Sequence, residues 1–273
     1  MDLLIPVIML AGLGLVFGLG LALVLKFFGV EVDPTVALII PKLPGANCGA
    51  CGSAGCEGFA EALKKGAALP SDCVVANDSV RSEIARILGV SYEKKAKLVA
   101  TLRCNGGVRA KDTFEYSGIP TCKAAALVFG GQKACAYGCL GFGDCVKVCA
   151  FDALRITDEG LPEVDPGKCT SCGRCVTACP KGLFELLRIE KRFYVKCSSR
   201  DMGGVVARSC KGGCIGCKKC EKACPKSAIK VEQYLSRINF DACENIGKCA
   251  EVCPTKVIKE RLPVARYQLA SNF

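Results

Sequence analysis

The sequence predicts an α+β chain in which one membrane helix precedes several small, cysteine-rich modules. Three observations support this prediction. An uncharged stretch of 23 residues lies near the N-terminus, 23 of the 273 residues are cysteine, and most of those cysteines fall into short, regular runs. A chain of this length is enough for about two modest domains, so each module has to be small.

The N-terminal apolar stretch is Leu3–Leu25, which carries no charged side chain. At about 1.5 Å of rise per residue, a helix of this length spans roughly 34 Å and can cross a hydrocarbon core of about 30 Å. It is too long for the core of a signal peptide, and no basic residue precedes it. Lys26 and Lys42 follow it, which favours the cytoplasmic side for the rest of the chain. A cleaved signal or a buried core helix is the alternative.

Thiolate is the one strong, soft metal ligand that the sequence offers, because the chain contains no histidine. This excludes Rieske centres, histidine-ligated haem and mixed Cys/His zinc fingers. Three uses of so many cysteines then compete: a disulfide framework, Cys₄ zinc sites and iron–sulfur clusters. A reducing cytoplasm disfavours the disulfide framework.

The formal net charge of +11 invites a nucleic-acid hypothesis, but it counts every cysteine as neutral. A 4Fe–4S core held by four thiolates carries roughly 2− in all, because ligating thiols are deprotonated. Five such clusters would add about −10 and bring the chain close to neutral. The basic balance is therefore poor evidence for DNA or RNA, and no nucleic-acid partner is expected.

The first cysteine group lies in the stretch ANCGACGSAGCEGF and ends in SDC. Its glycines let the backbone wrap closely round a cluster, and the offset of its third cysteine argues against the paired knuckles of a zinc site. We expect a helix over residues 57–65 to lead to its last member. The predicted ligands of one 4Fe–4S cluster are Cys48, Cys51, Cys56 and Cys73.

The second group contains two successive runs. The later run, Cys169–Cys179, matches the bacterial pattern Cys-x₂-Cys-x₂-Cys-x₃-Cys-Pro in full, whereas the earlier run is stretched and is followed by Ala150 in place of proline. In two-cluster ferredoxins the fourth cysteine of each run binds the other cluster. Crossed ligation then predicts one cluster on Cys135, Cys139, Cys145 and Cys179, and another on Cys169, Cys172, Cys175 and Cys149.

The third group repeats this design with one departure, because Ile246 stands where the middle cysteine of its second run belongs. Isoleucine cannot bind iron, so the last cluster is either 3Fe–4S or 4Fe–4S with an outside ligand. Cys197 and Cys210 are the unassigned thiols nearest in sequence. The predicted sets are Cys214, Cys217, Cys220 and Cys253, then Cys224, Cys243 and Cys249 with Cys210 as a candidate extra ligand.

Four cysteines stay outside these five sets, and lone cysteines are more often inert buried thiols than ligands. They are Cys104, Cys122, Cys197 and Cys210. The first two lie in residues 96–130, which contain no cluster run and are interpreted as a mixed connector.

Apolar residues follow the closing cysteine of each run, as the short strands of a ferredoxin βαβ pattern require. The predicted fold class is therefore α+β, with a single N-terminal transmembrane helix, a small four-cysteine 4Fe–4S domain and two bacterial-ferredoxin-like, two-cluster modules. The expected boundaries are 1–28 for the anchor, 29–95 for the four-cysteine domain, 96–130 for the connector, 131–190 for the first module, and 191–273 for the second module and the C-terminal tail.

This layout resembles the B subunit of the Rnf complex, the membrane-bound ferredoxin:NAD⁺ oxidoreductase that couples electron transfer to Na⁺ or H⁺ transport. The stretches CAYGCLGFGDCVKVCAFDAL and CKGGCIGCKKCEKACPKSAI look like that family as well. The resemblance implies a protein that accepts electrons from soluble reduced ferredoxin and relays them through about five iron–sulfur clusters, mostly 4Fe–4S. It also implies other Rnf membrane and peripheral subunits as partners, and a single-pass location in the inner (cytoplasmic) membrane with the cluster domains on the cytoplasmic side.

No nucleotide fingerprint accompanies these motifs, since the glycines of GLGLVFGLG lie inside the membrane stretch and not between a strand and a helix. No catalytic residue and no NAD or flavin site is expected on this chain. Six lysines near the third cysteine group would steer an acidic ferredoxin or simply offset cluster charge. They are Lys211, Lys218, Lys219, Lys222, Lys226 and Lys230.

Two other functions compete with this one. The first is an iron–sulfur electron-transfer subunit of another membrane-bound redox complex, of the hydrogenase or reductase type, which its partners would distinguish. The second is a zinc-held regulatory or nucleic-acid module, whose sole attraction is the basic residue count. Iron–sulfur protein is coloured and zinc protein is not, so visible absorbance separates these two chemistries.

Overall fold

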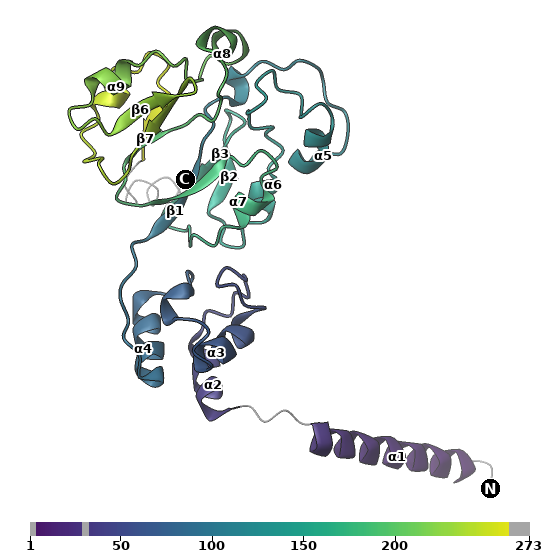
Figure 1. The fold of residues 1–273 in the computed structure, drawn as a ribbon. Helices are drawn as coiled ribbons and strands as arrows, with labels where there is room; N and C mark the ends of the chain where they lie inside the picture. Colours follow the sequence, from purple (N-terminus) through teal and green to yellow (C-terminus); the bar gives the residue numbers. More distant parts are fainter. Residues whose placement is uncertain (1–3, 29–32, 262–273) are drawn as a thin grey trace.

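The computed structural model describes residues 4–28 and 33–261, and its first element is the helix α1 (Leu4–Phe28) (Figure 1). The window Ile5–Val24 has a mean hydropathy of 2.6, and none of it is buried against other parts of the chain. In length and composition α1 is therefore able to cross a membrane, as the apolar stretch predicted.

A small helical unit follows α1 and contains the first cysteine group. It consists of α2 (Pro34–Ile39), η1 (Ile40–Lys42), α3 (Cys56–Lys64), η2 (Pro70–Asp72) and α4 (Asp78–Leu88). The helix expected over residues 57–65 is α3. Ile39, Phe59 and Ile84 are almost completely buried at its centre, so the apolar faces of α2, α3 and α4 form one core.

The rest of the described chain holds four two-stranded sheets, and every pair in them is antiparallel. The pairs are β1 (Leu98–Leu102) with β4 (Phe184–Arg188), β2 (Leu154–Ile156) with β3 (Pro162–Val164), β5 (Phe193–Val195) with β8 (Ile258–Glu260), and β6 (Ile229–Glu232) with β7 (Leu235–Ile238).

This pairing corrects one detail of the predicted βαβ pattern. Parallel neighbours need a crossover of a dozen or more residues, usually with a helix. Short turns join β2 to β3 and β6 to β7, so these neighbours can pair only as hairpins. In the second hairpin the two turn residues, Gln233 and Tyr234, both have positive φ, the backbone of a type I′ turn.

Residues 96–130 do more than connect. Strand β1 lies in this segment and pairs with β4 of the first module over five residue pairs, from Leu98↔Arg188 to Leu102↔Phe184. The segment also contains η3 (Gly107–Arg109) and α5 (Cys122–Leu127). Lys123 at the start of α5 donates its backbone N–H to Asp144 Oδ2 at 3.0 Å, so α5 is anchored to the first module.

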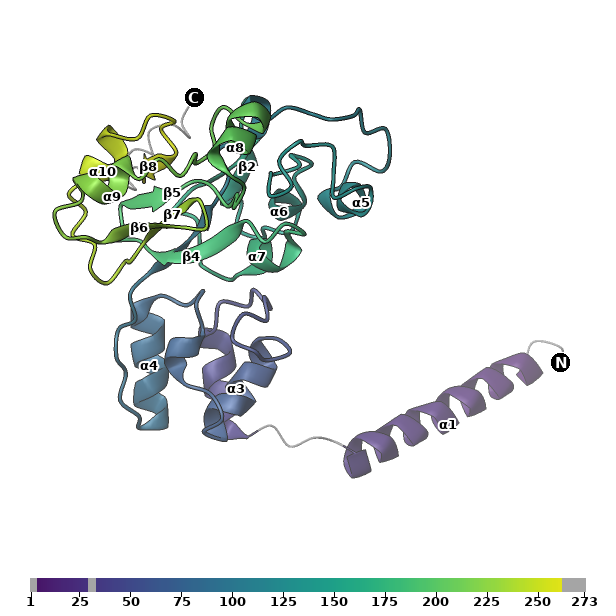
Figure 2. The ribbon, with the colours of Figure 1, turned by 45° about the horizontal axis from the view of Figure 1, so that its top comes forward.

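Each ferredoxin-like module has its own core, and among the described residues the first contains two short helices and the second contains three. Leu161 and Leu183 are central in the first module, and Ile229 and Val257 are central in the second. The two modules lie side by side in both views, with α8 at their common edge (Figures 1 and 2). The helices are α6 (Asp144–Lys147) and α7 (Arg174–Ala178), α8 (Gly203–Ser209), then α9 (Lys219–Ala223) and α10 (Lys248–Glu251).

One backbone pattern recurs in all four cysteine runs of the two modules. The residue two positions before the third ligand position of the motif has positive φ in each run: Gly143, Gly173, Lys218 and Gly247. The third residue after the closing cysteine also has positive φ in each run: Asp152, Gly182, Ser227 and Lys256. The run that contains Ile246 therefore folds like the three others.

Candidate metal centres

The first cysteine group is gathered on the loops before α3 and α4. Asn47 Oδ1 accepts a hydrogen bond from the backbone N–H of Cys56 at 2.8 Å, and Arg81 Nε donates to the carbonyl oxygen of Cys73 at 2.9 Å. Burial raises the pKa of the Cys73 thiol, and charge on Cys51 and Cys48 raises it further. Three of the four predicted ligands are thus close enough to influence one another.

The loop before α3 depends on glycine. Gly55 has φ +114°, and a Cβ atom there would stand 3.0 Å from Asn47 Oδ1. A larger residue at this position would therefore strain the backbone and press on the hydrogen bond that holds Cys56.

The second predicted ferredoxin set is brought together as the crossed pattern requires. Burial raises the pKa of the Cys175 thiol to about 12, and charge on Cys169, Cys172 and Cys149 raises it as well. Cys149 comes from the preceding run, so the structure places the fourth cysteine of one run beside the first three of the next.

The other site of the first module differs from its predicted set. A cavity beside β4 is lined by four cysteines together with apolar residues such as Leu183 and Phe184. Burial raises the pKa of Cys145 to about 12, and charge on Cys122 and Cys179 contributes. The four cysteines of this cavity are Cys122, Cys139, Cys145 and Cys179.

Cys122, expected as an inert thiol, thus stands where Cys135 was expected. Cys135 does not belong to the described lining of this cavity; besides burial, the thiols that raise its pKa are Cys104 and Cys210. The sequence did contain a signal for this arrangement. Cys139 and Cys145 are six residues apart, as Cys243 and Cys249 are.

In the third group the first site also assembles from two runs. Ser236 Oγ lies 3.2 Å from Cys220 Sγ and 3.5 Å from Cys214 Sγ. Burial raises the pKa of Cys220, and the hydrogen bond to Ser236 opposes this rise. Charge on Cys214 and Cys253 raises the pKa further. Burial opposes ionisation of Cys253, but backbone N–H donors outweigh it and lower the pKa of that thiol. Cys217 is exposed.

At the last site, three cysteines lie close together, and Ile246 stands at the motif position between two of them. The pKa of Cys249 is raised to about 11, first by burial and then by charge on Cys224 and Cys243. The loop is well anchored, because Asn245 Oδ1 accepts from the backbone N–H of Arg192 at 2.9 Å. Ile246 is 47% exposed, so its side chain does not fill the site.

The donor chemistry of these sets fits iron–sulfur clusters. Backbone N–H groups donate to sulfur at equivalent places of the two modules, from Leu183 to Cys179 at 3.4 Å and from Ala228 to Cys224 at 3.3 Å. Such hydrogen bonds, with burial, tune the potential of a cluster. Within residues 4–28 and 33–261, no three Cys, Asp or Glu side chains stand close enough to hold a single metal ion.

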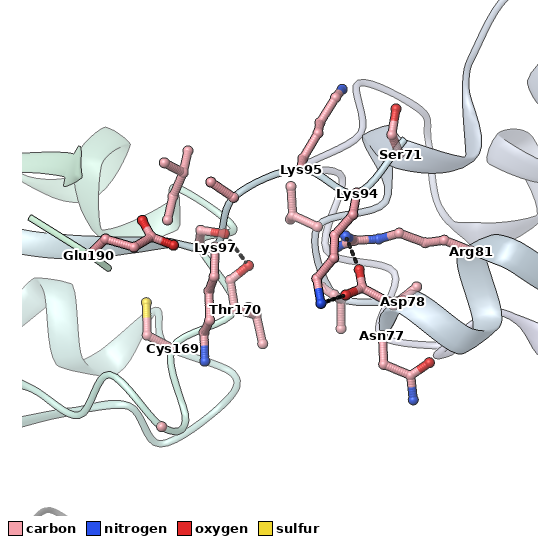
Figure 3. Close-up of a pocket in the computed structure, with 17 residues that line it drawn as sticks. Ser71, Asn77, Asp78, Arg81, Lys94, Lys95, Lys97, Cys169, Thr170 and Glu190 are labelled. Carbon is pink, nitrogen blue, oxygen red and sulfur yellow. Dashed lines mark hydrogen bonds and ion pairs between the residues drawn. The ribbon is translucent and has the colours of Figure 1, made fainter. Parts of the chain in front are cut away.

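Two larger cavities, of about 700 and 720 Å³, lie where the four-cysteine domain meets the first module. The first is lined by Lys94 and Arg81, which both pair with Asp78, and by the Cys169 loop opposite them (Figure 3). The second is lined by Cys48 from the four-cysteine domain and by Cys172 from the first module. The ligand loops of these two sites therefore face one another.

Comparison with known proteins identifies the same parts. A family profile for an Fe-S cluster domain matches residues 43–75, and one for a 4Fe-4S dicluster domain matches residues 134–183 and 213–257. These matches confirm an iron–sulfur domain followed by dicluster domains. Cys104, Cys122, Cys197 and Cys210 lie outside all the matched residues.

Three curated relatives are similar over most of the chain. The B subunit of the Na⁺-translocating ferredoxin:NAD⁺ oxidoreductase complex of Acetobacterium woodii is 46% identical over 88% of this chain and 72% of its own length. The B subunit of the proton-translocating complex of Clostridium ljungdahlii is 42% identical over 85% and 82%. The B subunit of the ion-translocating oxidoreductase complex of Methanosarcina acetivorans is 40% identical over 92% and 96%.

Proposed function

The chain belongs to the family of B subunits of ion-translocating ferredoxin:NAD⁺ oxidoreductase complexes, and from this premise we propose that it takes electrons from reduced ferredoxin and delivers them to membrane partner subunits. The observation that carries the proposal is the fourfold repeat of one ligand-bearing backbone, with a further four-cysteine set next to the first module. Bound clusters supply one-electron transfer, and the chain holds their ligands in adjacent sets.

The geometry supports the following ligands in the five expected sites. Cys122 replaces Cys135 in the first module, because it lines the cavity with the other three thiols. The remaining sets are those of the sequence analysis. The proposed sets are Cys48, Cys51, Cys56 and Cys73; Cys122, Cys139, Cys145 and Cys179; Cys149, Cys169, Cys172 and Cys175; Cys214, Cys217, Cys220 and Cys253; and Cys224, Cys243 and Cys249.

For the last of these sites we propose a 3Fe–4S cluster. The charges that act on Cys249 come from Cys224, Cys243 and, more weakly, Cys220, which belongs to the neighbouring set. Cys210, the candidate extra ligand, lies beside Cys104 instead. Three thiolates are then available for this cluster.

The proposed location follows from α1. We propose that the cluster domains lie on the cytoplasmic side of the cytoplasmic membrane; the single apolar helix, followed by the sparse positive charge of Lys26 and Lys42, supports this orientation. That side is reducing, which suits thiolate ligands. The four-cysteine domain follows α1 directly in the chain, so among the cluster domains it is the one attached closest to the membrane helix.

The proposed docking face for ferredoxin surrounds Cys217. This proposed ligand is itself exposed, and the six lysines near it in sequence are all exposed. Opposite charges raise the rate of encounter at low salt, so an acidic ferredoxin would be guided to the ligand with the least protein cover. The lysines are Lys211, Lys218, Lys219, Lys222, Lys226 and Lys230.

Charge reversal tests this face. The double variant Lys218→Glu/Lys219→Glu should slow electron uptake from reduced ferredoxin about tenfold at low ionic strength and weaken its salt dependence. Stopped-flow bleaching of the visible absorbance measures the rate. Lys65→Glu, an exposed lysine on the four-cysteine domain, is the matched control. Equal rates in wild type and the double variant would refute the docking face.

Iron and acid-labile sulfide analysis with EPR tests the proposal as a whole. Anaerobically purified, full-length protein should contain iron and labile sulfide in the amounts that the proposed clusters require, and reduced ferredoxin should bleach its visible absorbance. A folded chain without labile sulfide would end the proposal.

A further inference from the structure

Four cysteines of this chain are outside the ligand sets described so far, and they lie close together. Cys104, Cys197 and Cys210 are buried, and Cys135 is half-buried. They come from four separate segments: the end of β1, the start of the first module, the residues after β5, and the end of α8. The segments therefore meet between the two modules.

The pair at the centre of this group is Cys104 and Cys210. A Cβ atom on Gly106 would stand 3.4 Å from Cys104 Sγ and 3.6 Å from Cys210 Sγ, so both sulfur atoms border the same point. The backbone fixes this approach, because Ala110 and Cys210 form an isolated antiparallel bridge. Asn105 Nδ2 also donates to the carbonyl oxygen of Gly212 at 3.3 Å.

The other two thiols flank this pair. The backbone N–H of Ala134 donates to the carbonyl oxygen of Lys111 at 2.8 Å, and the N–H of Lys111 donates to that of Ser209 at 2.9 Å. The residue before Cys135 is therefore held beside the Ala110–Cys210 bridge. Ser198 Oγ donates to the carbonyl oxygen of Arg103 at 3.0 Å, which holds the residue after Cys197 against the residue before Cys104.

Backbone donors point at these sulfur atoms. Cys104 Sγ accepts from the N–H of Gly106 and from the N–H of Cys139, each at 3.4 Å, and Cys197 Sγ accepts from the N–H of Cys214 at 3.4 Å. Neutral buried thiols are weak acceptors, whereas ligating thiolates are regularly stabilised by such donors.

Positive charge is provided at the same place. Arg109 Nε donates to the carbonyl oxygen of Asn105 at 2.9 Å, and Lys133 Nζ donates to that of Gly107 at 3.3 Å, so both cations border the loop that follows Cys104. Each is also paired with a carboxylate, Arg109 with Glu159 and Lys133 with Asp112. Cations beside four thiols would offset part of the negative charge of a ligated cluster.

From this geometry we propose that Cys104, Cys135, Cys197 and Cys210 hold a sixth iron–sulfur cluster, of the 4Fe–4S type, between the two ferredoxin-like modules. The proposal rests on the proposed function and extends it. It also accounts for all 23 cysteines of the chain, since five sets of four thiols and one set of three use each cysteine once.

The position explains what the sixth cluster would do. One of its ligands, Cys104, is hydrogen-bonded by the backbone of Cys139, a ligand residue of the first module. Another, Cys197, is hydrogen-bonded by the backbone of Cys214, a ligand residue of the second module. A cluster held there would lie between the ligand loops of the two modules and would supply one-electron transfer between them. Each thiol would lose a proton when its sulfur binds iron.

The test is the iron and sulfide content of anaerobic, full-length protein. Wild type should hold about 23 iron atoms per chain if the Ile246 site is 3Fe–4S, against about 19 without the sixth cluster. The double variant Cys104→Ala/Cys210→Ala should lose about four of each element, while EPR of the reduced protein should retain the signals of the other clusters. Ser209→Ala, a buried neighbour of Cys210, is the matched control and should lose none.

A second variant covers the case in which the double variant does not fold. Cys135→Ala changes the half-buried member of the set and should lose the same four iron atoms. Wild-type iron and sulfide content in a folded Cys135→Ala or double variant would overturn the sixth cluster and leave the other five. Failure of the proposed function looks different, because labile sulfide would then be missing from wild type itself.

Discussion

Phe142 in the first module and Ile246 in the second occupy the same position of the repeated backbone. Each stands midway between two cysteines of its run, where the complete runs have Cys172 and Cys217. The residue before each of these four positions has positive φ: Gly141, Ser171, Gly216 and Asn245. Both modules thus keep the backbone of a complete site although one middle cysteine is missing from each.

The modules differ in what replaces the missing thiol. In the first, Phe142 packs against Cys122 and Ala125 of α5, and Cys122 enters the cavity with the three thiols of the site. In the second, the Ile246 side chain is about half exposed, and no thiol of the described residues takes its place. The segment 96–130, which pairs with the first module through β1, supplies a fourth thiol to this cavity, and the second module has no such thiol among the described residues.

Under the proposed ligand assignment, the backbone and the ligand set of a cluster site are separable. Loops with positive φ at fixed places form the cradle, and glycine or a strained residue is needed there. The thiols then come from whichever segment packs against the cradle. A site can therefore be complete without a complete motif, and a motif with one cysteine missing can still fold as a site.

The largest effect is expected from removing the Cys122 thiol and then placing a thiol at position 142. Cys122→Ala should cost the first module one cluster, about four iron atoms per chain. Phe142→Cys in the same chain should restore them, because position 142 is the middle position of the motif. Iron analysis and EPR of anaerobic protein measure both steps.

The matched control for this prediction combines Phe142→Cys with the removal of a different cysteine, Cys135. Phe142→Cys should not restore the iron that Cys135→Ala removes, because Cys135 lies beside Cys104 and Cys210. Rescue of Cys135→Ala together with full iron in Cys122→Ala would contradict the assignment and favour the ligand set predicted from the sequence.

A smaller effect is expected at the second module. Ile246→Cys restores the complete motif on a backbone that already has the right form, so it should convert the 3Fe–4S cluster to 4Fe–4S. The gain is about one iron atom per chain, and the EPR signal of the oxidised 3Fe centre should disappear. Ile246→Ser provides a hydroxyl of similar size to the thiol and is the control. An unchanged signal in Ile246→Cys would mean that the site is not a 3Fe–4S cluster in wild type.

Much of this arrangement could be predicted from the sequence, because cluster motifs are local. The complete runs that end in Cys179-Pro180 and Cys224-Pro225 predict their own loops and short helices. Iron–sulfur domains and the family were predicted correctly for the same reason. The apolar stretch of α1 needed no tertiary information.

The role of Cys122 and the environment of Cys104 could not be predicted in this way. Both depend on the packing of residues 96–130 against the first module, which is fixed by the pairing of β1 with β4 and by the hydrogen bond from Lys123 to Asp144. Such contacts join residues far apart in the sequence and leave no spacing pattern. The antiparallel hairpins were missed because the strands are only three to five residues long.

The smallest effect separates two glycines that share one role. Gly173 and Gly247 both precede a short helix with positive φ, but a Cβ atom at 173 would meet nothing within 4 Å, whereas one at 247 would stand 2.7 Å from Phe193 Cζ. Gly173→Ala should therefore cost only the left-handed strain, about 1–2 kcal/mol. Gly247→Ala should cost roughly 1–3 kcal/mol more, because Phe193 is buried in the core of the second module and cannot move freely.

Thermal unfolding of anaerobic protein, monitored by the loss of visible absorbance, compares the two glycine variants. Phe193→Leu should remove most of the excess in a double-mutant cycle; equal losses for the two glycines would show that the packing of β5 does not constrain the Ile246 loop.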